Sequence, residues 1–212
     1  MDLVHQLAND YALKHSSQID DLLSEVTQYT INNHPEAHMI SGALQGNLLT
    51  MISKMIQPKY ILEIGTFTGY SALCLTKGLQ KGGVLHTIER RSSEADVAQR
   101  FFDKSLYKKQ ICLHVGDAKN VLKDLHMDWD LVFVDADKTG YVGYYEFLVE
   151  TVKPGTWLIF DNVFFHGEVF KEPLTGKNAK AIDAFNKGIM DDPRVEQLML
   201  TIRDGLTLLY KK

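Results

Sequence analysis

Acidic and amide side chains follow two apolar segments in the second half of the chain. Leu131-Val-Phe-Val134 precedes Asp135, and Trp157-Leu-Ile-Phe160 precedes Asp161 and Asn162. If the two segments are neighbouring parallel strands, their carboxyl ends bring these three side chains together. Carboxylate and amide oxygens suit Mg²⁺, Mn²⁺ or Ca²⁺ rather than zinc. Each aspartate could instead cap a turn, but the set favours a divalent cation site.

Two glycines, Gly65 and Gly69, separate a predicted strand at 60–64 from a helix that begins near Ser71. Glycine there lets backbone N–H groups approach a ligand at the start of a helix. Dinucleotide sites have the spacing G-x-G-x-x-G, but here Phe67 takes the place of the second glycine and would crowd a pyrophosphate. The turn therefore favours a ligand without phosphates, such as S-adenosylmethionine, over a nicotinamide dinucleotide.

Two glutamates lie near this turn. Glu63 is inside the apolar strand, where it either accepts hydrogen bonds from the backbone of the loop or contacts the cofactor directly. Glu89 ends a second predicted strand at 84–89, about 20 residues after Gly69, and an acidic residue at that distance reaches a ribose diol. We therefore expect Glu89 to bind the ribose.

Composition limits the remaining possibilities. The 212 residues, 45% of them hydrophobic, suffice for one substantial core, and the net charge of −4 comes from interspersed charges. Nucleic acids and anionic membranes are therefore not expected partners. The sequence has no signal-peptide pattern and no membrane-spanning run, which predicts a cytoplasmic protein. Cys74 and Cys112 lack a paired spacing and are expected to be reduced core residues.

The hydrophobic periodicity predicts alternating strands and helices over most of the chain. The predicted strands are 60–64, 84–89, 111–115, 130–134, 156–161, 195–202 and 206–210. The predicted helices are 2–14, 17–32, 41–57, 69–80, 93–105, 117–125, 141–152 and 178–190. Asp204-Gly205 is a hairpin signal between the last two strands. We expect a single α/β domain over 1–212, with a Rossmann-like, doubly wound, mostly parallel seven-stranded sheet that ends in an antiparallel edge pair.

The motifs, taken in order, resemble those of the cation-dependent O-methyltransferases, which include catechol and caffeoyl-CoA O-methyltransferases. The resemblance runs from about Met39 to the C-terminus. Its motifs are Glu63-Ile-Gly65-x-x-x-Gly69-Tyr70-Ser71, Glu89, Gly116-Asp117-Ala118, Asp135-Ala-Asp137-Lys138 followed by Tyr141, Asp161-Asn162, and Asp204-Gly205-Leu206-Thr207. The resemblance implies a class I methyltransferase fold, in which 1–57 form helices over the cofactor and substrate side, and a homodimer.

The resemblance also implies roles for individual residues. The methionine end of the cofactor would lie against Gly65, Phe67, Tyr70 and Ser71, with Asp135 facing it, and Glu89 would hold the ribose. Asp117 and Ala118 would border the adenine, and the segment with Met39 and Ser41 would lie over the cofactor. Glu63 and Gly69 complete the expected cofactor-binding residues. The implied metal ligands are Asp135, Asp161 and Asn162, and Lys138 would act with Asp135 on the substrate hydroxyl.

The implied reaction is methyl transfer from the sulfonium of S-adenosylmethionine to an oxygen of a catechol-like aromatic diol. A bound cation, most simply Mg²⁺, would stabilise the oxyanion, and Lys138 could complete the deprotonation if the cation disfavours its ammonium form. Ala37 and Asp137 replace the aromatic residues of the catechol enzyme, which brings the chain closer to the caffeoyl-CoA branch, although no basic region for an acyl-CoA is evident. Aromatic residues at 163–170 could form a platform for a flat ring, or could belong to the core or to a dimer contact.

Two other classes of function remain as alternatives. A nicotinamide-dependent oxidoreductase would account only for the glycine turn and Glu89. A catalytically silent binding domain would keep the cofactor loop but would not need Asp135, Asp161, Asn162 and Lys138 in matching places.

Overall fold

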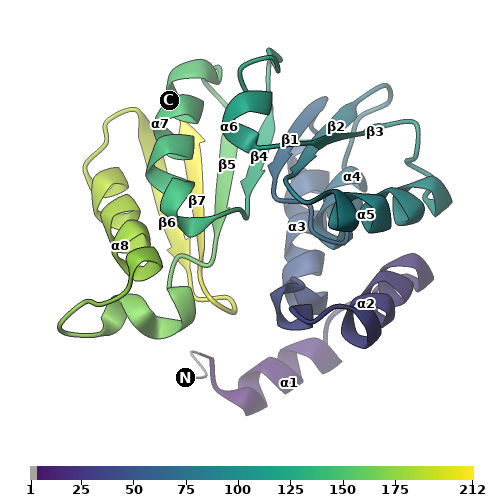
Figure 1. Cartoon of the computed structure of the whole chain (residues 1–212), viewed down its shortest axis with the longest axis horizontal. Coiled ribbons are helices and arrows are strands. Elements are labelled where there is room, and N and C mark those ends of the chain that lie inside the picture. The colour runs from purple at the N-terminus through teal and green to yellow at the C-terminus, as the bar shows by residue number, and fades with distance from the viewer. Residues whose placement is uncertain (1–3) are drawn as a thin grey trace.

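The computed structural model describes residues 4–212 and contains a seven-stranded sheet with the order β3-β2-β1-β4-β5-β7-β6 (Figure 1). The strands are β1 (Tyr60–Ile64), β2 (Val84–Glu89), β3 (Ile111–Val115), β4 (Leu131–Val134), β5 (Trp157–Asp161), β6 (Val195–Leu200) and β7 (Leu206–Lys211). Strands β1 to β5 pair in parallel, whereas β7 is antiparallel to both β5 and β6. The predicted mixed sheet with an antiparallel edge pair is confirmed.

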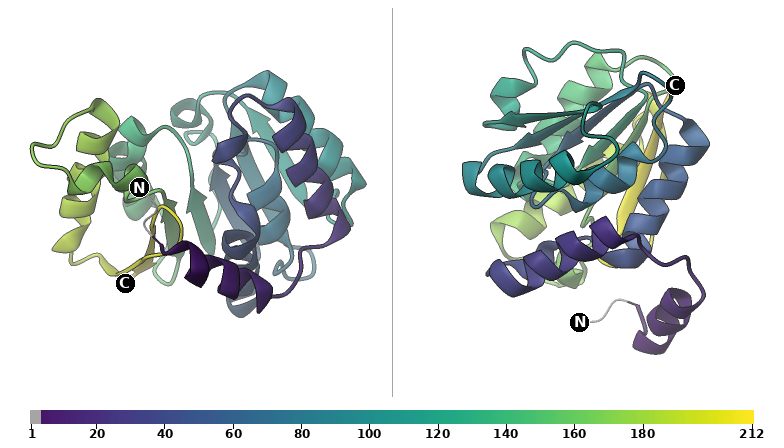
Figure 2. Two further views of the ribbon diagram at one scale, coloured as in Figure 1. Left: turned by 90° about the horizontal axis from the view of Figure 1, so that it is seen from below. Right: turned by 90° about the vertical axis from the view of Figure 1, so that its right-hand side faces the viewer.

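Helices cover both faces of the sheet. They are α1 (Gln6–Lys14), α2 (Asp21–Asn33), α3 (Gly42–Ile56), α4 (Tyr70–Thr76), α5 (Ser92–Lys104), α6 (Ala118–Val121), α7 (Tyr141–Thr151) and α8 (Lys177–Met190). Short 3₁₀ segments are η1 (Ala37–Met39), η2 (Lys138–Gly140) and η3 (Phe165–Phe170). Figure 2 shows α1 as the outermost of the N-terminal helices, and α1 has no buried residues.

The central strands are buried on both faces, which explains why they appear in the sequence as unbroken apolar runs. Successive side chains alternate between the two faces. Ile61 and Leu131 pack with α2 to α5, whereas Leu62 and Val132 pack with α6 to α8. The two halves of the core therefore meet only through the sheet, and the sheet fixes where each strand ends.

Several helices are shorter than predicted, for local reasons. Helix α2 begins at Asp21 rather than at 17, because the side chain of Asp20 caps it by accepting the N–H of Leu23 at 2.9 Å. Helix α4 ends at Thr76, and a Cβ at Gly78 would lie 2.1 Å from the backbone of Ser53. Residues 2 and 3 of the first predicted helix lie outside the described residues.

The two cysteines differ from the prediction that both are core residues. Cys74 is buried, and burial raises the pKa of its thiol to about 12. Cys112 is exposed, because β3 is the edge strand of the sheet and part of its surface remains open. The prediction for Cys112 was wrong. Within residues 4–212, no helix is both long and apolar enough to cross a membrane.

The strand order reverses between β1 and β4, since β2 and β3 lie on one side of β1 and β4 and β5 on the other. Such a reversal opens a crevice at the carboxyl ends of the strands. Gly65, just after β1, has φ 100°, and a Cβ there would lie 1.9 Å from the carbonyl oxygen of Asp135. The loops after β1 and β4 are therefore in direct backbone contact.

This contact predicts that Gly65→Ala costs much more stability than an alanine at another glycine with positive φ. Gly82, with φ 77°, is the matched control, because a Cβ there would meet nothing within 4 Å. Gly82→Ala should cost about 1–2 kcal/mol through backbone strain alone. Gly65→Ala should cost about 1–3 kcal/mol more through the clash. Urea unfolding measures both, and equal losses would contradict the close contact.

Candidate active site

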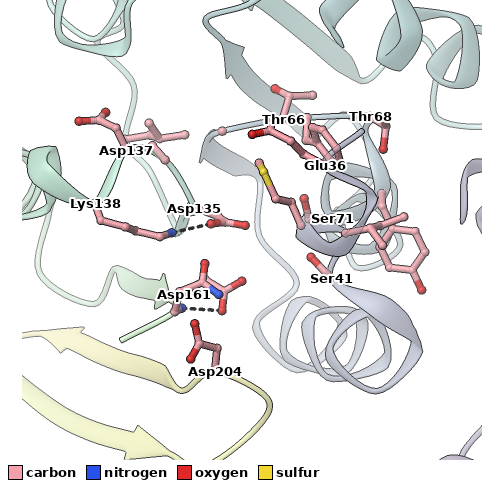
Figure 3. A pocket seen from close by; sticks show the side chains of 18 of the residues that line it. Glu36, Ser41, Thr66, Thr68, Ser71, Asp135, Asp137, Lys138, Asp161 and Asp204 are labelled. Atoms are coloured by element: carbon pink, nitrogen blue, oxygen red, sulfur yellow. Dashed lines mark hydrogen bonds and ion pairs between the residues drawn. The ribbon is translucent and has the colours of Figure 1, made fainter. Parts of the chain in front are cut away.

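A cavity of about 850 Å³ opens at the carboxyl ends of the parallel strands (Figure 3). Its volume is within the range of about 300–1,000 Å³ that is typical of ligand and cofactor sites. All of the predicted site residues line it except Glu63 and Gly69. The predicted residues that line the cavity are Met39, Ser41, Gly65, Phe67, Tyr70, Ser71, Glu89, Asp117, Ala118, Asp135, Lys138, Asp161 and Asn162.

Glu89 ends β2 and forms part of the cavity wall. Its Oε2 accepts the N–H of Phe67 at 2.8 Å, and its Oε1 accepts the N–H of Arg91 at 2.9 Å. The first bond holds Phe67 at φ 51°, a left-handed conformation that is costly outside glycine. Glu89 therefore fixes the shape of the glycine turn, and each oxygen keeps a lone pair for a ligand hydroxyl.

Gly69 supports the turn from outside the cavity. It precedes α4 with φ 92°, and a Cβ there would lie 2.8 Å from the ring of Phe102. Glycine at this position allows α4 to pack closely on α5, so its role here is in packing.

Glu63 lies behind the turn and is fully buried. Its Oε2 accepts the hydroxyl of Thr87, which also contacts the hydroxyl of Thr66. Its Oε1 has no hydrogen-bond partner among residues 4–212, and burial raises the pKa of Glu63 to about 8. Its partner is therefore a threonine on β2 and not the loop backbone. Glu63 does not line the cavity, and its direct contact with the cofactor stays a prediction.

Asp135 and Asp161 follow the neighbouring strands β4 and β5, and both line the cavity. Asp161 is 2% exposed, and its Oδ1 accepts the N–H of Asn162 at 2.7 Å. Burial and the adjacent charge of Asp135 raise the pKa of Asp161 to about 7. Two neighbouring carboxylates favour a cation between them.

Lys138 is the cation that Asp135 contacts in this structure. Its Nζ lies 2.8 Å from Asp135 Oδ1 and 2.8 Å from the hydroxyl of Tyr141, which in turn donates to the carbonyl of Asp161 at 2.7 Å. Burial opposes the charge of Lys138, but Asp135, Tyr141 and Asp161 together outweigh burial and raise the pKa of Lys138. The expected loss of the ammonium form beside a bound cation stays a prediction, because it concerns the site with the cation present.

The chemistry of the donors fits a hard divalent cation. The set has two carboxylates and the amide of Asn162, without sulfur or imidazole, and it leaves positions for water or a ligand oxygen. Within the described chain, no group of three or more His, Cys, Asp or Glu side chains is placed to hold a metal. A cation here would therefore depend on Asn162 and on oxygens from outside the protein.

The aromatic loop after β5 is only partly directed at the cavity. Phe165 and His166 line it, with φ values of 45° and 57°. Phe164 is 9% exposed and packs on Phe170, with ring centroids 5.4 Å apart. The predicted platform is therefore reduced to Phe165 and His166, while Phe164 belongs to the core.

Sequence reasoning missed three polar residues near the carboxylates. Gln45 is buried and bonded to Asp161, Arg203 is bonded to Gln45, and Asp204 accepts the N–H of His166 at 2.6 Å. Asp204 lay in a recognised motif but was taken only as a turn residue. No sequence pattern indicated a role for Arg203, because its partners Ser41 and Gln45 are distant in sequence.

Comparisons with known proteins agree on one family. The sequence model for the O-methyltransferase family matches residues 13–212. A probable caffeoyl-CoA O-methyltransferase of Dictyostelium discoideum is 32% identical over 208 residues, which cover 95% of this chain and 90% of the relative. A catechol O-methyltransferase of Niastella koreensis is 31% identical over 177 residues, which cover 79% of this chain and 80% of the relative.

Solved structures give the same result. The Podospora anserina methyltransferase PaMTH1, crystallised with S-adenosylhomocysteine, is 32% identical with a TM-score of 0.89, covering 97% of this chain and 94% of that one. An O-methyltransferase from Bacillus cereus, also with S-adenosylhomocysteine, is 28% identical with a TM-score of 0.86, covering 97% of each chain.

The burial of Glu63 predicts a particular pH dependence of stability. The pKa of this carboxyl is about 8 in the folded protein, against 4.5 as its ordinary value. Between these pH values the Glu63 carboxyl keeps its proton in the folded state but releases it in the unfolded state. The stability that the protonated carboxyl contributes is therefore complete below about pH 4.5 and is lost as the pH rises to about 8. Glu63→Gln should reduce the loss of unfolding free energy with rising pH by up to about 1.4 kcal/mol per pH unit. Urea unfolding across this range measures it, and equal slopes for both proteins would contradict the assignment.

Proposed function

The chain belongs to the O-methyltransferase family, and we propose that it transfers the methyl group of S-adenosylmethionine to one hydroxyl of a catechol-like aromatic diol with the help of a divalent cation. The enzyme class follows from the family match over residues 13–212 and from the similarity to cofactor-bound methyltransferases. The observation that carries the proposal is the convergence of Asp135, Asp161 and Asn162 beside Lys138 in the cavity that also contains Glu89.

The two ends of the cavity suit two ligands. Strand order puts Glu89 and Asp117 at the β2 and β3 side, and Asp161 at the β5 side. We assign the ribose of S-adenosylmethionine to Glu89 and its adenine to the border formed by Asp117 and Ala118. The methionine end would lie at the glycine turn, and Asp135 would separate it from the acceptor.

The acceptor would lie between the carboxylates and the loop that contains Phe165 and His166. Asp135, Asp161 and Asn162 would hold the cation, which as a Lewis acid supplies stabilisation of the acceptor oxyanion. Relatives named as caffeoyl-CoA and catechol O-methyltransferases support an aromatic diol. The ring of Phe165, at the cavity wall, suits a flat aromatic acceptor.

Lys138 could serve as a positive charge beside the acceptor or as the group that accepts its proton, and the hydrogen bonds of Lys138 distinguish these two roles. As an ammonium held by Asp135 and Tyr141, it places positive charge beside the acceptor. A cation bound by Asp135 would offset the charge that raises the pKa of Lys138 most, and would thereby favour the neutral amine that can accept a proton. We propose Lys138 as the residue that handles the acceptor proton under that condition.

We also propose that the enzyme forms a homodimer through an apolar surface on α3 and the β7–β6 edge. Met51, Met55 and Leu198 are 52%, 76% and 57% exposed. Met55 also lines a hollow together with Trp157 and Tyr210, among others. Light scattering tests this proposal, and a particle of 24.0 kDa, the mass of one chain, would contradict it.

The cytoplasmic location stays a prediction from the sequence.

The proposed site predicts that methylation of a catechol stops in EDTA and returns with Mg²⁺ or Mn²⁺. Asp161→Ala and Asn162→Ala should reproduce the effect of EDTA, because a Lewis acid contributes several kcal/mol to such a transition state. Transfer of radiolabelled methyl groups from S-adenosylmethionine measures the rate. Asp96→Asn, on the exposed surface of α5, serves as a control that should keep full activity. Full turnover in EDTA would refute the metal assignment.

A further inference from the structure

Gln45 links two charged groups across the cavity wall. It is 1% exposed; its Nε2 donates to Asp161 Oδ2 at 2.5 Å, and its Oε1 accepts from Arg203 Nη1 at 3.0 Å. These residues come from three elements: α3, the end of β5 and the loop between β6 and β7. A single carboxamide thus joins a guanidinium to the buried carboxylate.

The chemistry of the partners allows only one orientation of this amide. Arginine can only donate hydrogen bonds, and an ionised carboxylate can only accept them. The carbonyl oxygen of Gln45 must therefore face Arg203, and its NH₂ group must face Asp161. Arg203 consequently determines which group Gln45 presents to the carboxylate.

Arg203 is itself held by the backbone. Its Nη1 also donates to the carbonyl of Ser41, and its φ is 50° in the tight loop that Gly205 closes through an N–H bond to the carbonyl of Ile202 at 2.9 Å. A Cβ at Gly205 would lie 2.7 Å from the ring of Phe164, so this loop has little room to shift. The guanidinium is therefore a fixed support.

Asp161 is held at both oxygens. Oδ2 accepts from Gln45, and Oδ1 accepts the N–H of Asn162 at 2.7 Å. The plane of the carboxylate is thereby fixed, while one lone pair on each oxygen remains uncommitted by these two bonds. Partners of this kind orient metal ligands, and their loss weakens metal binding.

We infer that Gln45 and Arg203 are positioning residues that fix the Asp161 carboxylate in the orientation in which it binds the divalent cation. This inference rests on the proposed function, since it assumes the cation site. Gln45 does not line the cavity, so it acts through Asp161 and not on substrate or cofactor.

The test is calorimetric titration of Mn²⁺ into the wild-type protein and into Gln45→Met, which keeps the length of the side chain but cannot donate. We expect Gln45→Met to weaken Mn²⁺ binding by about 10–100-fold. Its affinity for S-adenosylhomocysteine should not change, a separation that general damage to the fold would not produce. Gln99→Met is the matched control, because Gln99 donates to Asp103 at 2.8 Å on the exposed surface of α5 and should bind Mn²⁺ like the wild type.

A double-mutant cycle tests whether Arg203 acts on Asp161 through Gln45. Arg203→Met should also weaken Mn²⁺ binding. The double variant should lose no more affinity than Gln45→Met alone, because Arg203 bonds Gln45 and Gln45 bonds Asp161. Arg203 is exposed, so its variant decides the question if Gln45→Met fails to fold. Additive losses would overturn the inference.

The outcomes separate this inference from the function on which it rests. Wild-type Mn²⁺ affinity in Gln45→Met, or an equal loss in Gln99→Met, would overturn the positioning role and leave the metal-dependent function intact. A wild-type protein that binds no Mn²⁺ would overturn both the metal assignment and this inference.

Discussion

Asp135 and Asp161 lie at the carboxyl ends of neighbouring parallel strands, so the backbone brings two carboxylates to the wall of the same cavity. The surrounding polar groups pair with these carboxylates or donate hydrogen bonds to them. Lys138 pairs with Asp135, Asn162 and Gln45 hold the two oxygens of Asp161, and the β6–β7 loop supports Gln45. Burial and the neighbouring carboxylate raise the pKa of Asp161, and a divalent cation at this place would oppose that rise. The charge that the fold concentrates here is thus the feature on which the proposed metal-assisted methyl transfer depends.

The cofactor side of the cavity depends on backbone geometry instead of charge. Glu89 holds Phe67 in a left-handed conformation, and Gly65 lets the turn touch the carbonyl of Asp135. The two halves of the site are therefore joined by a backbone contact between the loops after β1 and β4. That contact sets the relation between the glycine turn and the carboxylates, which in-line transfer requires.

Much of the fold could be predicted from the sequence, because buried parallel strands appear as apolar runs; the predicted bounds of β1, β2 and β3 match the structure. Helix ends were less predictable, since caps and packing such as that at Gly78 decide them. The carboxylate cluster was found because strand ends converge in parallel sheets. Gln45 was missed as its partner, because 116 residues separate it from Asp161 and only the tertiary structure brings them together. The exposure of Cys112 was missed because the sequence does not reveal which strand is at the edge.

The central claim is that one divalent cation joins the two carboxylates to the acceptor beside the cofactor. The most direct test is a crystal structure with S-adenosylhomocysteine, Mn²⁺ and a catechol, with anomalous data that locate the manganese. The account predicts one manganese ion bound by Asp135, Asp161 and Asn162 and by the catechol oxygens, with the ribose at Glu89. Manganese bound elsewhere, or a catechol bound in the cavity without contact to a metal, would contradict it.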